Sequence, residues 1–413
     1  MNVTIDLYIL WIVIVFFSRS RAMITDGLLG GMLFVVVGLI CITQCLLIYT
    51  KKKPLTLKLV LPYLFIIFGR TVFYTRLDPV DFFVDCIIFF PVLMFFLLPE
   101  AVVDKMLDKV KTIIALLVGV SFSLYLLDIV GVSIPILEYV YHGKDKIINY
   151  YYLYVSYPED KFRYCGLFIE PGYNSLVLVC MILVNNFNFK LKSTWLYLMA
   201  FICTFSLGGY ILFVVGYSMF LLIKQGSISR ALFIMGAIVV TLGAVTFVSL
   251  SYNGGNNYFA EKIIMRLMID DDNGIAGNNR EGLVALPIID SFFYSNSIWM
   301  GVGKDVFYKA IDIPDFDACS WRQFVIMYGA VYTIFLFVTS VFLLKRTTIK
   351  RVLPFFIVYW VDFIQHGDLF MGSIFLLMMY GCANVKKGVA YQKMPIRTKN
   401  VYNCNDFHSN GDL

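Results

Sequence analysis

Apolar runs of about 20 residues recur along this chain, and their length constrains its fold more than any other feature. A helix of that length crosses the hydrocarbon core of a bilayer. The composition agrees, because 60% of the 413 residues are apolar and only 15% are charged. So little polar surface excludes a soluble enzyme, a disordered chain and a nucleic-acid-binding domain. We therefore expect an integral membrane protein that has the lipid bilayer as a partner and binds no nucleic acid.

The number of apolar runs predicts an all-α polytopic membrane protein with about twelve transmembrane helices. The expected spans are residues 3–18, 27–49, 56–74, 80–98, 112–131, 166–187, 193–207, 209–223, 231–250, 323–344, 353–366 and 368–384. We expect residues 1–384 to form a single transmembrane domain and the polar segment 385–413 to form a cytoplasmic tail.

The charges in the loops predict the orientation. With the N-terminus in the cytoplasm, more than half of the 34 Lys and Arg residues fall in the cytoplasmic loops and tail, whereas most of the 28 Asp and Glu residues fall outside. This asymmetry follows the positive-inside rule. Both termini are then cytoplasmic, and two long loops, at about 132–165 and 251–322, lie on the outer face. The second is far longer than a connection requires, so we expect it to carry function, with a passive cap as the alternative.

The strongest chemical signal is the stretch 163–174 at the start of the sixth expected span. It holds Arg163, Glu170 and Asn174, and Glu170 falls about one turn inside the apolar segment. A carboxylate there is costly unless it is paired or faces a wet cavity, and Pro171 interrupts the helical hydrogen bonding beside it. The stretch therefore indicates a functional site. The alternative is an Arg163–Glu170 ion pair that only fixes the end of the helix.

The second signal is a set of residues in the second long loop and at the start of the tenth expected span. They are Arg280, the segment Gly301-Val302-Gly303, Asp317, Arg322 and Gly329. Two guanidinium groups on one face of a membrane can clamp a pyrophosphate, because the arginine fork matches phosphate oxygens bidentately. The alternative for Arg280 is a solvated loop residue.

The third signal is the segment 206–210, which reads Ser-Leu-Gly-Gly-Tyr and divides a long apolar stretch into two short pieces. Its twin glycines predict a tight reversal at the outer face. Further ionisable residues in spans are Asp85 and the pair Asp362 and His366, which lie four residues apart. Such residues indicate function by default. A buried Asp–His or Asp–Arg pair that only holds the helices together is the alternative.

The sequence predicts no metal site and no cofactor. The run Asp270-Asp271-Asp272 could attract a divalent cation, but a solvated acidic loop is the favoured interpretation. The chain has three histidines, no pair of cysteines with zinc spacing and no glycine-rich nucleotide loop. Cys165 and Cys319 both fall at the outer boundary of the membrane. The sequence allows a disulfide between them but does not establish one.

Taken in order, these pieces resemble the Wzy-type O-antigen polymerases and the related O-antigen ligase superfamily. The family pattern combines an arginine near a Gly-x-Phe-x-Glu-Pro-like stretch, a Ser-x-Gly-Gly-like turn, a long loop with an arginine and a Gly-Val-Gly-like segment, and a polar cluster before a glycine-bearing span. The matching residues are Arg163, Gly166, Phe168, Glu170, Pro171, Ser206, Gly208, Gly209, Arg280, Gly301, Gly303, Asp317, Ser320 and Gly329. The resemblance covers about residues 160–330. Ligases typically carry a His-Asn pair where this chain reads Asp317-Ala318-Cys319-Ser320, which favours a polymerase.

The resemblance implies a glycosyltransferase-C-like fold that polymerises undecaprenyl-diphosphate-linked repeat units of O-antigen or a related surface polysaccharide. The reaction would take place at the periplasmic face of the bacterial inner membrane, without a cofactor. Lipid-linked glycans would be donor and acceptor, and a chain-length regulator and a flippase would be partners in the pathway. The residues implied for pyrophosphate or substrate binding are Arg163, Arg280, Arg322, Asn174 and Tyr210, and those implied as the general base are Glu170 and Asp317.

Two other functions fit part of the pattern. A flippase or other transporter of lipid-linked oligosaccharides also tends to have about twelve spans, but it would place its charges near the bilayer midplane and show related halves. In this chain the charges crowd the outer ends of the spans and one loop dominates. An O-antigen ligase is the second alternative.

Overall fold

The computed structural model describes most of the helical part of the chain. The described residues are 28–50, 57–73, 78–98, 100–136, 138–142, 146–151, 153–168, 170–225, 228–267, 269–270, 274–275, 285–311, 321–344 and 349–366. The first and last expected spans and the tail lie outside them.

Helices account for most of the described residues, and they coincide with the apolar runs. They are α2 (Leu28–Thr50), α3 (Leu57–Phe73), α4 (Pro79–Leu97), α5 (Glu100–Ile129), α6 (Pro171–Val184), α7 (Lys192–Ile202), α8 (Leu207–Gln225), α9 (Ile228–Ser251), α12 (Trp321–Leu344) and α13 (Ile349–His366). Each overlaps one expected span. Most boundaries agree within a few residues, and the differences at α5, α6 and α7 have identifiable causes.

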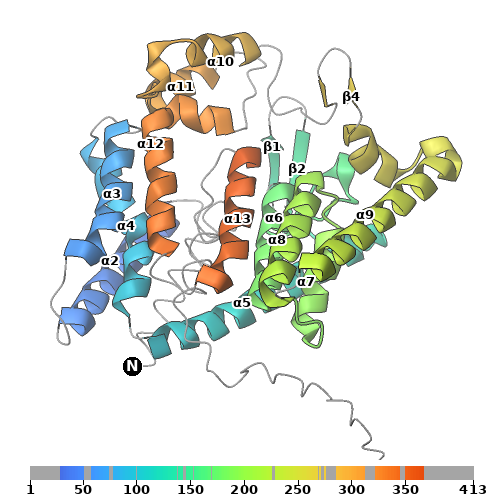
Figure 1. Ribbon diagram of the computed structural model, residues 1–413, viewed down its shortest axis with the longest axis horizontal. Coiled ribbons are helices and arrows are strands. Elements are labelled where there is room, and N and C mark those ends of the chain that lie inside the picture. Colours follow the sequence, from blue (N-terminus) through green and yellow to red (C-terminus); the bar gives the residue numbers. More distant parts are fainter. Residues whose placement is uncertain are drawn as a thin grey trace, which may run out of the picture.

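The helices form two groups joined by α13 (Figure 1). Helices α2, α3, α4 and α12 pack on one side, and α6, α7 and α8 pack on the other. Helix α13 contacts α8, α6 and α12, so it lies between the groups. Helix α9 contacts α8 but leans away from the body, and Phe233, Val240 and Phe247 on it are largely exposed.

Within the described part of the chain, two helical segments, Ala101–Ile129 and Trp321–Val341, are long and apolar enough to cross a membrane. Helices α6 and α7 have only 14 and 11 residues, whereas a full crossing needs about 20. The expected seventh span, 193–207, is therefore too long. The helix ends at Ile202 because the chain reverses before Ser206, with Phe205 at a φ of 44°.

Helix α5 begins at Glu100, well before the expected start at residue 112. The intervening residues carry several charges, which suggested a loop. Val103, Met106 and Val110 in this segment are buried, however, and they recur at the spacing of one helical face. The segment is therefore an amphipathic helix that continues into the apolar run.

The first long loop folds into a small antiparallel sheet, so the fold is mostly helical and not all-α. Strands β1 (Glu138–His142), β2 (Lys146–Tyr151) and β3 (Tyr154–Ser156) pair in sequence order. Glu138 lies opposite Tyr150 in the first pair, and Asn149 lies opposite Ser156 in the second. Aromatic and β-branched residues dominate these strands, and such residues favour a pleated, half-buried surface.

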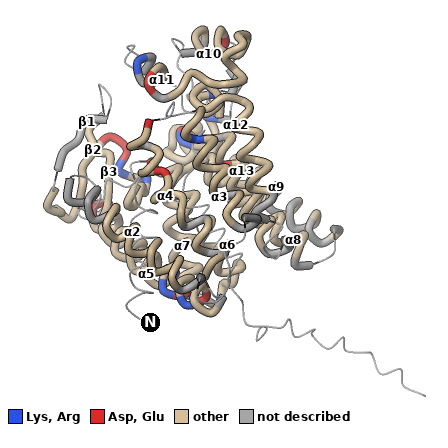
Figure 2. The backbone as a smooth tube through the Cα atoms, turned by 90° about the vertical axis from the view of Figure 1, so that its left-hand side faces the viewer, with Lys and Arg blue, Asp and Glu red and all other residues tan. Residues whose placement is uncertain are grey.

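The second long loop is also folded. It contains η2 (Tyr252–Gly255), η3 (Ala260–Ile264, a π-helix), η4 (Met265–Leu267), β4 (Ile269–Asp270), β5 (Gly274–Ile275), α10 (Ala285–Phe293), η5 (Asn296–Ile298) and α11 (Lys304–Ile311). Helices α10 and α11 lie over one end of α12 (Figure 1). Both ends of the helical body carry charged residues, whereas the helices between them are largely uncharged (Figure 2).

A break in α12 explains the glycines of the second long loop. Gly329 has φ 84° and ψ 157°, so the helical hydrogen bonds stop there. The segment 299–303 supplies the missing partners. The amides of Val302 and Gly303 donate to the carbonyls of Ile326 and Met327 at 2.8 and 3.0 Å, and the Val331 amide donates to the Trp299 carbonyl at 3.2 Å. Residues 299–303 of the loop therefore complete the backbone hydrogen bonding of α12 at its break.

Candidate substrate-binding site

Four side chains from the two long loops meet near the start of α6, and we call them the interloop cluster. They are Asp160, Arg163, Tyr258 and Lys262. The carboxylate Oδ2 of Asp160 lies 3.6 Å from Arg163 Nη1 and 3.5 Å from Lys262 Nζ. The Tyr258 hydroxyl donates to Asp160 Oδ1. One carboxylate thus joins two cations and a phenol that come from distant parts of the sequence.

The first long loop holds its half of the cluster through contacts with α5. Tyr154 and Ser156 on β3 donate to Asp128 Oδ2 at 3.2 and 3.1 Å. The Tyr125 hydroxyl donates to the carbonyl of Phe162 at 2.7 Å. Asp160 ends the short helix η1 (Pro158–Asp160), and the Arg163 amide donates to its carbonyl at 3.0 Å. The carboxylate and the guanidinium are therefore fixed in one tight turn.

The second long loop presents Tyr258 and Lys262 from the start of η3. Asn257 Oδ1 accepts from the Ala260 amide at 3.0 Å, and Asn257 Nδ2 donates to the Ser249 carbonyl at 2.6 Å, which ties this turn to α9. The ring of Tyr258 meets Phe205 edge-on, with the centroids 5.0 Å apart. Burial, and then the hydrogen bond to Asp160, raises the pKa of Tyr258. The phenol is therefore a neutral donor at physiological pH.

Lys262 has two further contacts. Its Nζ lies 2.9 Å from Glu261 Oε1 and 5.5 Å from the centroid of the Tyr258 ring. The Glu261 side chain is 61% exposed, whereas that of Lys262 is only 19% exposed. Water therefore screens the carboxylate of Glu261 far more than the ammonium of Lys262.

Glu170 lies just before α6 and not one turn inside it. It is the N-cap residue, with an extended backbone, and its half-buried side chain makes no capping hydrogen bond. Pro171 occupies the first helical position, where a missing amide hydrogen costs nothing. Burial raises the pKa of Tyr157, Glu170 adds to this effect and Arg163 opposes it. Glu170 and Arg163 thus both lie near the Tyr157 phenol. Arg163 itself forms its ion pair with Asp160, and its Nε donates to the Thr204 carbonyl at 3.5 Å.

An apolar groove of about 650 Å³ borders the cluster. Tyr258 belongs to both the groove and the cluster, and Phe205 together with Thr241, Val245 and Val248 of α9 also lines the groove. The groove therefore places a hydrocarbon-lined surface next to a group of charges. We call it the α9 groove.

Asn174 and Tyr210, both predicted to bind substrate, make contacts within the fold. Asn174 is buried in α6, and its Nδ2 donates to the Tyr164 carbonyl at 3.3 Å. Gly166, with φ 63°, makes room for it, because a Cβ there would meet Asn174 Oδ1 at 2.8 Å. The Tyr210 hydroxyl donates to the Ile202 carbonyl at 2.7 Å. Asn174 thus holds the backbone next to Arg163, and Tyr210 holds the backbone two residues before Thr204.

The twin glycines at 208–209 do not form the expected reversal. They lie in the first turn of α8, where Ser206 Oγ accepts from the Gly209 amide at 3.2 Å. A Cβ on Gly209 would meet Ser175 Oγ at 2.3 Å, so the absence of a side chain lets α8 approach α6 closely. The reversal precedes them, at Phe205.

Arg322 lies apart from the interloop cluster, at the start of α12. Its guanidinium pairs with Asp290 of α10 and lies 4.9 Å from the centroid of the Phe293 ring. These contacts tie α10 to α12.

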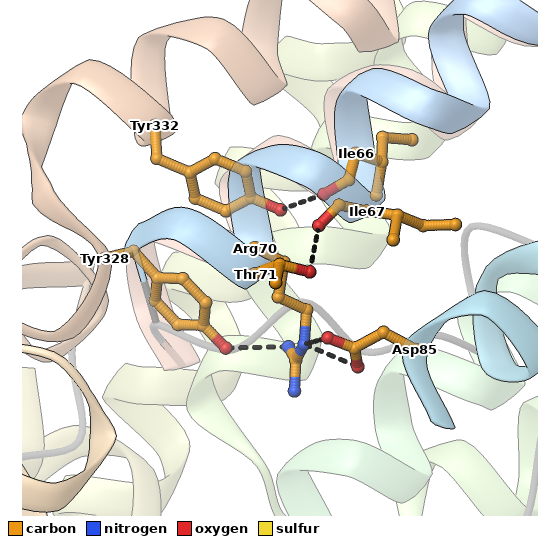
Figure 3. A network of polar contacts seen from close by, with 7 residues as sticks. All are labelled: Ile66, Ile67, Arg70, Thr71, Asp85, Tyr328 and Tyr332. Atoms are coloured by element: carbon orange, nitrogen blue, oxygen red, sulfur yellow. Dashed lines mark hydrogen bonds and ion pairs between the residues drawn. The ribbon is translucent and has the colours of Figure 1, made fainter. Parts of the chain in front are cut away.

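Asp85 belongs to a buried network between α3, α4 and α12 (Figure 3). Arg70 Nε donates to both of its carboxylate oxygens, at 2.8 and 2.9 Å, and Arg70 Nη1 donates to the Tyr328 hydroxyl at 2.8 Å. The adjacent Tyr332 donates to the Ile66 carbonyl at 3.1 Å. This is the Asp–Arg pair that the sequence left open as an alternative for Asp85, and it fastens three helices together.

The remaining candidate residues lie in α13, just before α6 or outside the described residues. Asp362 is buried in α13, and His366 is the last residue of that helix, with a side chain outside the description. Arg280, Asp317 and Cys319 lie outside the described residues. Cys165 is a free, buried thiol. Within the described ranges, no group of three or more His, Cys, Asp or Glu side chains is arranged to hold a metal ion.

Sequence reasoning missed Asp160, Tyr258 and Lys262. The i, i+3 spacing of Asp160 and Arg163 was a local signal for their contact, but nothing in the sequence indicated that residues near 260 would join them. Comparisons with protein-family models, curated proteins and solved structures find no match for this chain.

Proposed function

We propose that this chain is a glycosyltransferase that polymerises undecaprenyl-diphosphate-linked oligosaccharide units. The observation that supports it best is the juxtaposition of the interloop cluster and the α9 groove, which share Tyr258. A polyprenyl-diphosphate-linked glycan is an amphiphile of this kind, with an anionic head next to a long hydrocarbon tail. The head would lie at the cluster, and the first isoprene units would lie against α9.

The proposal places the protein in the bacterial inner membrane as a glycosyltransferase-C-like bundle with about twelve spans. Both termini face the cytoplasm, and the two long loops face the periplasm. The concentration of charge at the ends of the helical body supports this placement (Figure 2). The exposed apolar residues of α9, such as Phe233 and Phe247, would then face lipid.

The charges of the cluster suit a departing pyrophosphate. Asp160 is shared between Arg163 and Lys262, and Lys262 has a second, closer carboxylate in the exposed Glu261, at 2.9 Å. The N–O distances of 3.5 and 3.6 Å are longer than those of a tight charge-assisted hydrogen bond. A diphosphate oxygen can therefore replace the carboxylate as the partner of Arg163. Arg280, outside the described residues, is the second guanidinium of the proposed clamp, and Arg322, which is held by Asp290, is the third candidate.

The reaction joins the acceptor hydroxyl oxygen to the anomeric carbon of the donor. As that bond forms, the anomeric carbon–oxygen bond to the diphosphate breaks, and the polyprenyl diphosphate leaves with the electron pair. The hydroxyl proton passes to a carboxylate, for which Glu170 is the first candidate and Asp317 the second. A guanidinium fixed beside the leaving group stabilises the charge that grows there in the transition state.

The test is complementation of a host that lacks its own polymerase. The wild-type chain should restore a ladder of long glycan chains on gels, and Arg163→Ala should collapse the ladder to a single repeat unit at an unchanged protein level. Lys161→Ala is the matched control, because Lys161 is exposed two residues away, and it should leave the ladder intact. A full ladder from Arg163→Ala would refute the assignment of Arg163.

A second experiment separates the polymerase from a flippase and a ligase. Purified lipid-linked repeat units are mixed with the purified protein in detergent micelles. Growth of chains there requires an enzyme, because micelles offer no compartments for a flippase to connect. A requirement for a lipid A-core acceptor would instead indicate a ligase.

A further inference from the structure

The hairpin between α10 and α11 lies beside the middle of a helix that is long and apolar enough to cross a membrane. We call residues 296–303 the α12 hairpin. The hydrogen bonds from Val302, Gly303 and Val331 fix it against residues 326–331 of α12. Gly301 and Gly329 touch so closely that a Cβ on Gly301 would meet the Gly329 amide nitrogen at 2.5 Å. The position of the hairpin along α12 is therefore set by backbone contacts on both sides.

That position is well below the end of the helix. Gly329 follows Trp321 by eight residues, which corresponds to about 12 Å along a helix axis. At the helical rise, the 24 residues of α12, taken across the break at Gly329, correspond to about 36 Å, some 6 Å more than the hydrocarbon core of a bilayer. If α12 crosses the bilayer symmetrically, the hairpin reaches about 9 Å into the hydrocarbon.

The hairpin is uncharged, and its polar side chains Asn296 and Ser297 lie at its α10 end, before the apolar tip. No charged residue occurs between Asp290 and Lys304. Irregular backbone at this depth requires partners for its amides, because lipid offers none. The amide of Ile298 donates to the carbonyl of Ser295, just before the hairpin, and those of Trp299 and Gly301 donate to carbonyls within it. The amides of Val302 and Gly303 donate to α12.

The exposed side of the hairpin continues an apolar surface of α12. Trp299 and Met300 at its tip are 57% and 47% exposed. Val331, bonded through its amide to Trp299, is also exposed, as are Ile334 and Val338 on the same helical face. Tryptophan is enriched where hydrocarbon meets headgroups, because its ring is apolar and its N–H is polar. Trp299 thus extends the surface that α12 would turn to lipid.

We infer that the α12 hairpin is a re-entrant segment, with Trp299 and Met300 inserted among the lipid acyl chains of the outer leaflet. The inference rests on the membrane placement of α12 proposed above and not on glycosyl transfer. It assigns to the second long loop a fixed anchor in the bilayer.

The test uses tryptophan fluorescence in nanodiscs. One variant keeps Trp299 and carries phenylalanine at positions 11, 195, 321 and 360. Lipids brominated along their acyl chains should reduce its emission at least about twofold, and aqueous iodide should have little effect. The matched control is Asp305→Trp with all native tryptophans replaced, since Asp305 is exposed on α11. It should show the opposite pattern. Quenching of Trp299 by iodide and not by bromolipid would overturn the inference.

A second variant avoids the multiple replacements. Met300→Cys in the otherwise native full-length chain should react slowly with a charged maleimide in nanodiscs, while Asp305→Cys reacts rapidly. Mass spectrometry of the labelled peptides separates both sites from the native cysteines. Equal rates at the two positions would contradict a buried tip. Failure of this test would leave the glycan-ladder result unaffected, so the two proposals fail independently.

Discussion

The backbones of Gly301 and Gly329 lie in direct contact, and this contact joins a long loop to the interior of a helix. A Cβ on Gly329 would meet the Trp299 carbonyl oxygen at 2.5 Å and the Gly301 amide at 2.7 Å. Tyr328 directly precedes the break, and its hydroxyl accepts a hydrogen bond from Arg70 Nη1 at 2.8 Å. The two glycines are therefore required by close approach as well as by backbone conformation.

Gly329→Ala should destabilise the protein by about 2–5 kcal/mol, because it adds a steric clash to an unfavourable backbone conformation. Gly131→Ala is the matched control. Gly131 has the same φ of 84° but nothing within 4 Å of its Cβ position, so only the conformational cost of about 1–2 kcal/mol applies. Thermal unfolding in detergent measures both. Equal losses would contradict a close backbone contact.

Removing one partner of the Arg70–Asp85 pair should cost more than removing both. The Asp85 side chain is 5% exposed and that of Arg70 is 24% exposed, so Asp85→Asn should cost about 2–4 kcal/mol, somewhat less than in a fully buried pair. Arg70→Met combined with Asp85→Leu should recover part of this loss, because no charge is left buried alone. A double-mutant cycle on unfolding temperatures measures the coupling. A purely additive double variant would argue against the pair.

Asp160→Asn should loosen the turn that carries Tyr258 and Lys262. It removes the charge that both cations share and weakens the bond from Tyr258, for an expected local cost of about 1–2 kcal/mol. Hydrogen exchange of residues 252–267 should then speed up roughly tenfold. Glu159→Gln, at an exposed neighbouring carboxylate, should leave exchange unchanged. Unaltered exchange in Asp160→Asn would show that the cluster does not hold the loops together.

Stability should fall at alkaline pH through Cys165. Burial raises the pKa of its thiol from 9.0 to about 12. Between pH 9 and 12 the folded state therefore keeps a proton that the unfolded state releases. This thiol does not reduce the free energy of unfolding below pH 9, and it reduces it progressively as the pH rises from 9 toward 12. Cys165→Ala should unfold at a temperature that is less sensitive to pH between 9 and 11. Rapid alkylation of the native Cys165 thiol at pH 8 would contradict its burial.

The sequence by itself determined where the ten helices that overlap the expected spans lie, because an apolar run of a given length has few other ways to satisfy its backbone. It did not predict α10 and α11 of the second long loop. It also identified Asp85 as buried and partnered or functional, since an ionisable group among apolar residues needs a partner. It identified Gly301, Gly303 and Gly329 as special positions but not the reason. The amphipathic start of α5, residues 100–111, and the sheet of the first loop were missed because their patterns are short and interrupted by charges.

Only the tertiary structure decided which residues meet. The alternative that the sequence offered for Arg163 was an ion pair with Glu170, seven residues away. Its ionic partner in the structure is Asp160, and Asp160 in turn binds Tyr258 and Lys262 from another loop. Local periodicity encodes secondary structure, because hydrogen bonds in a helix join residues four apart. A contact between residues 160 and 258 produces no periodic pattern in the sequence, because it depends on how α5, α8 and α9 place the ends of both loops.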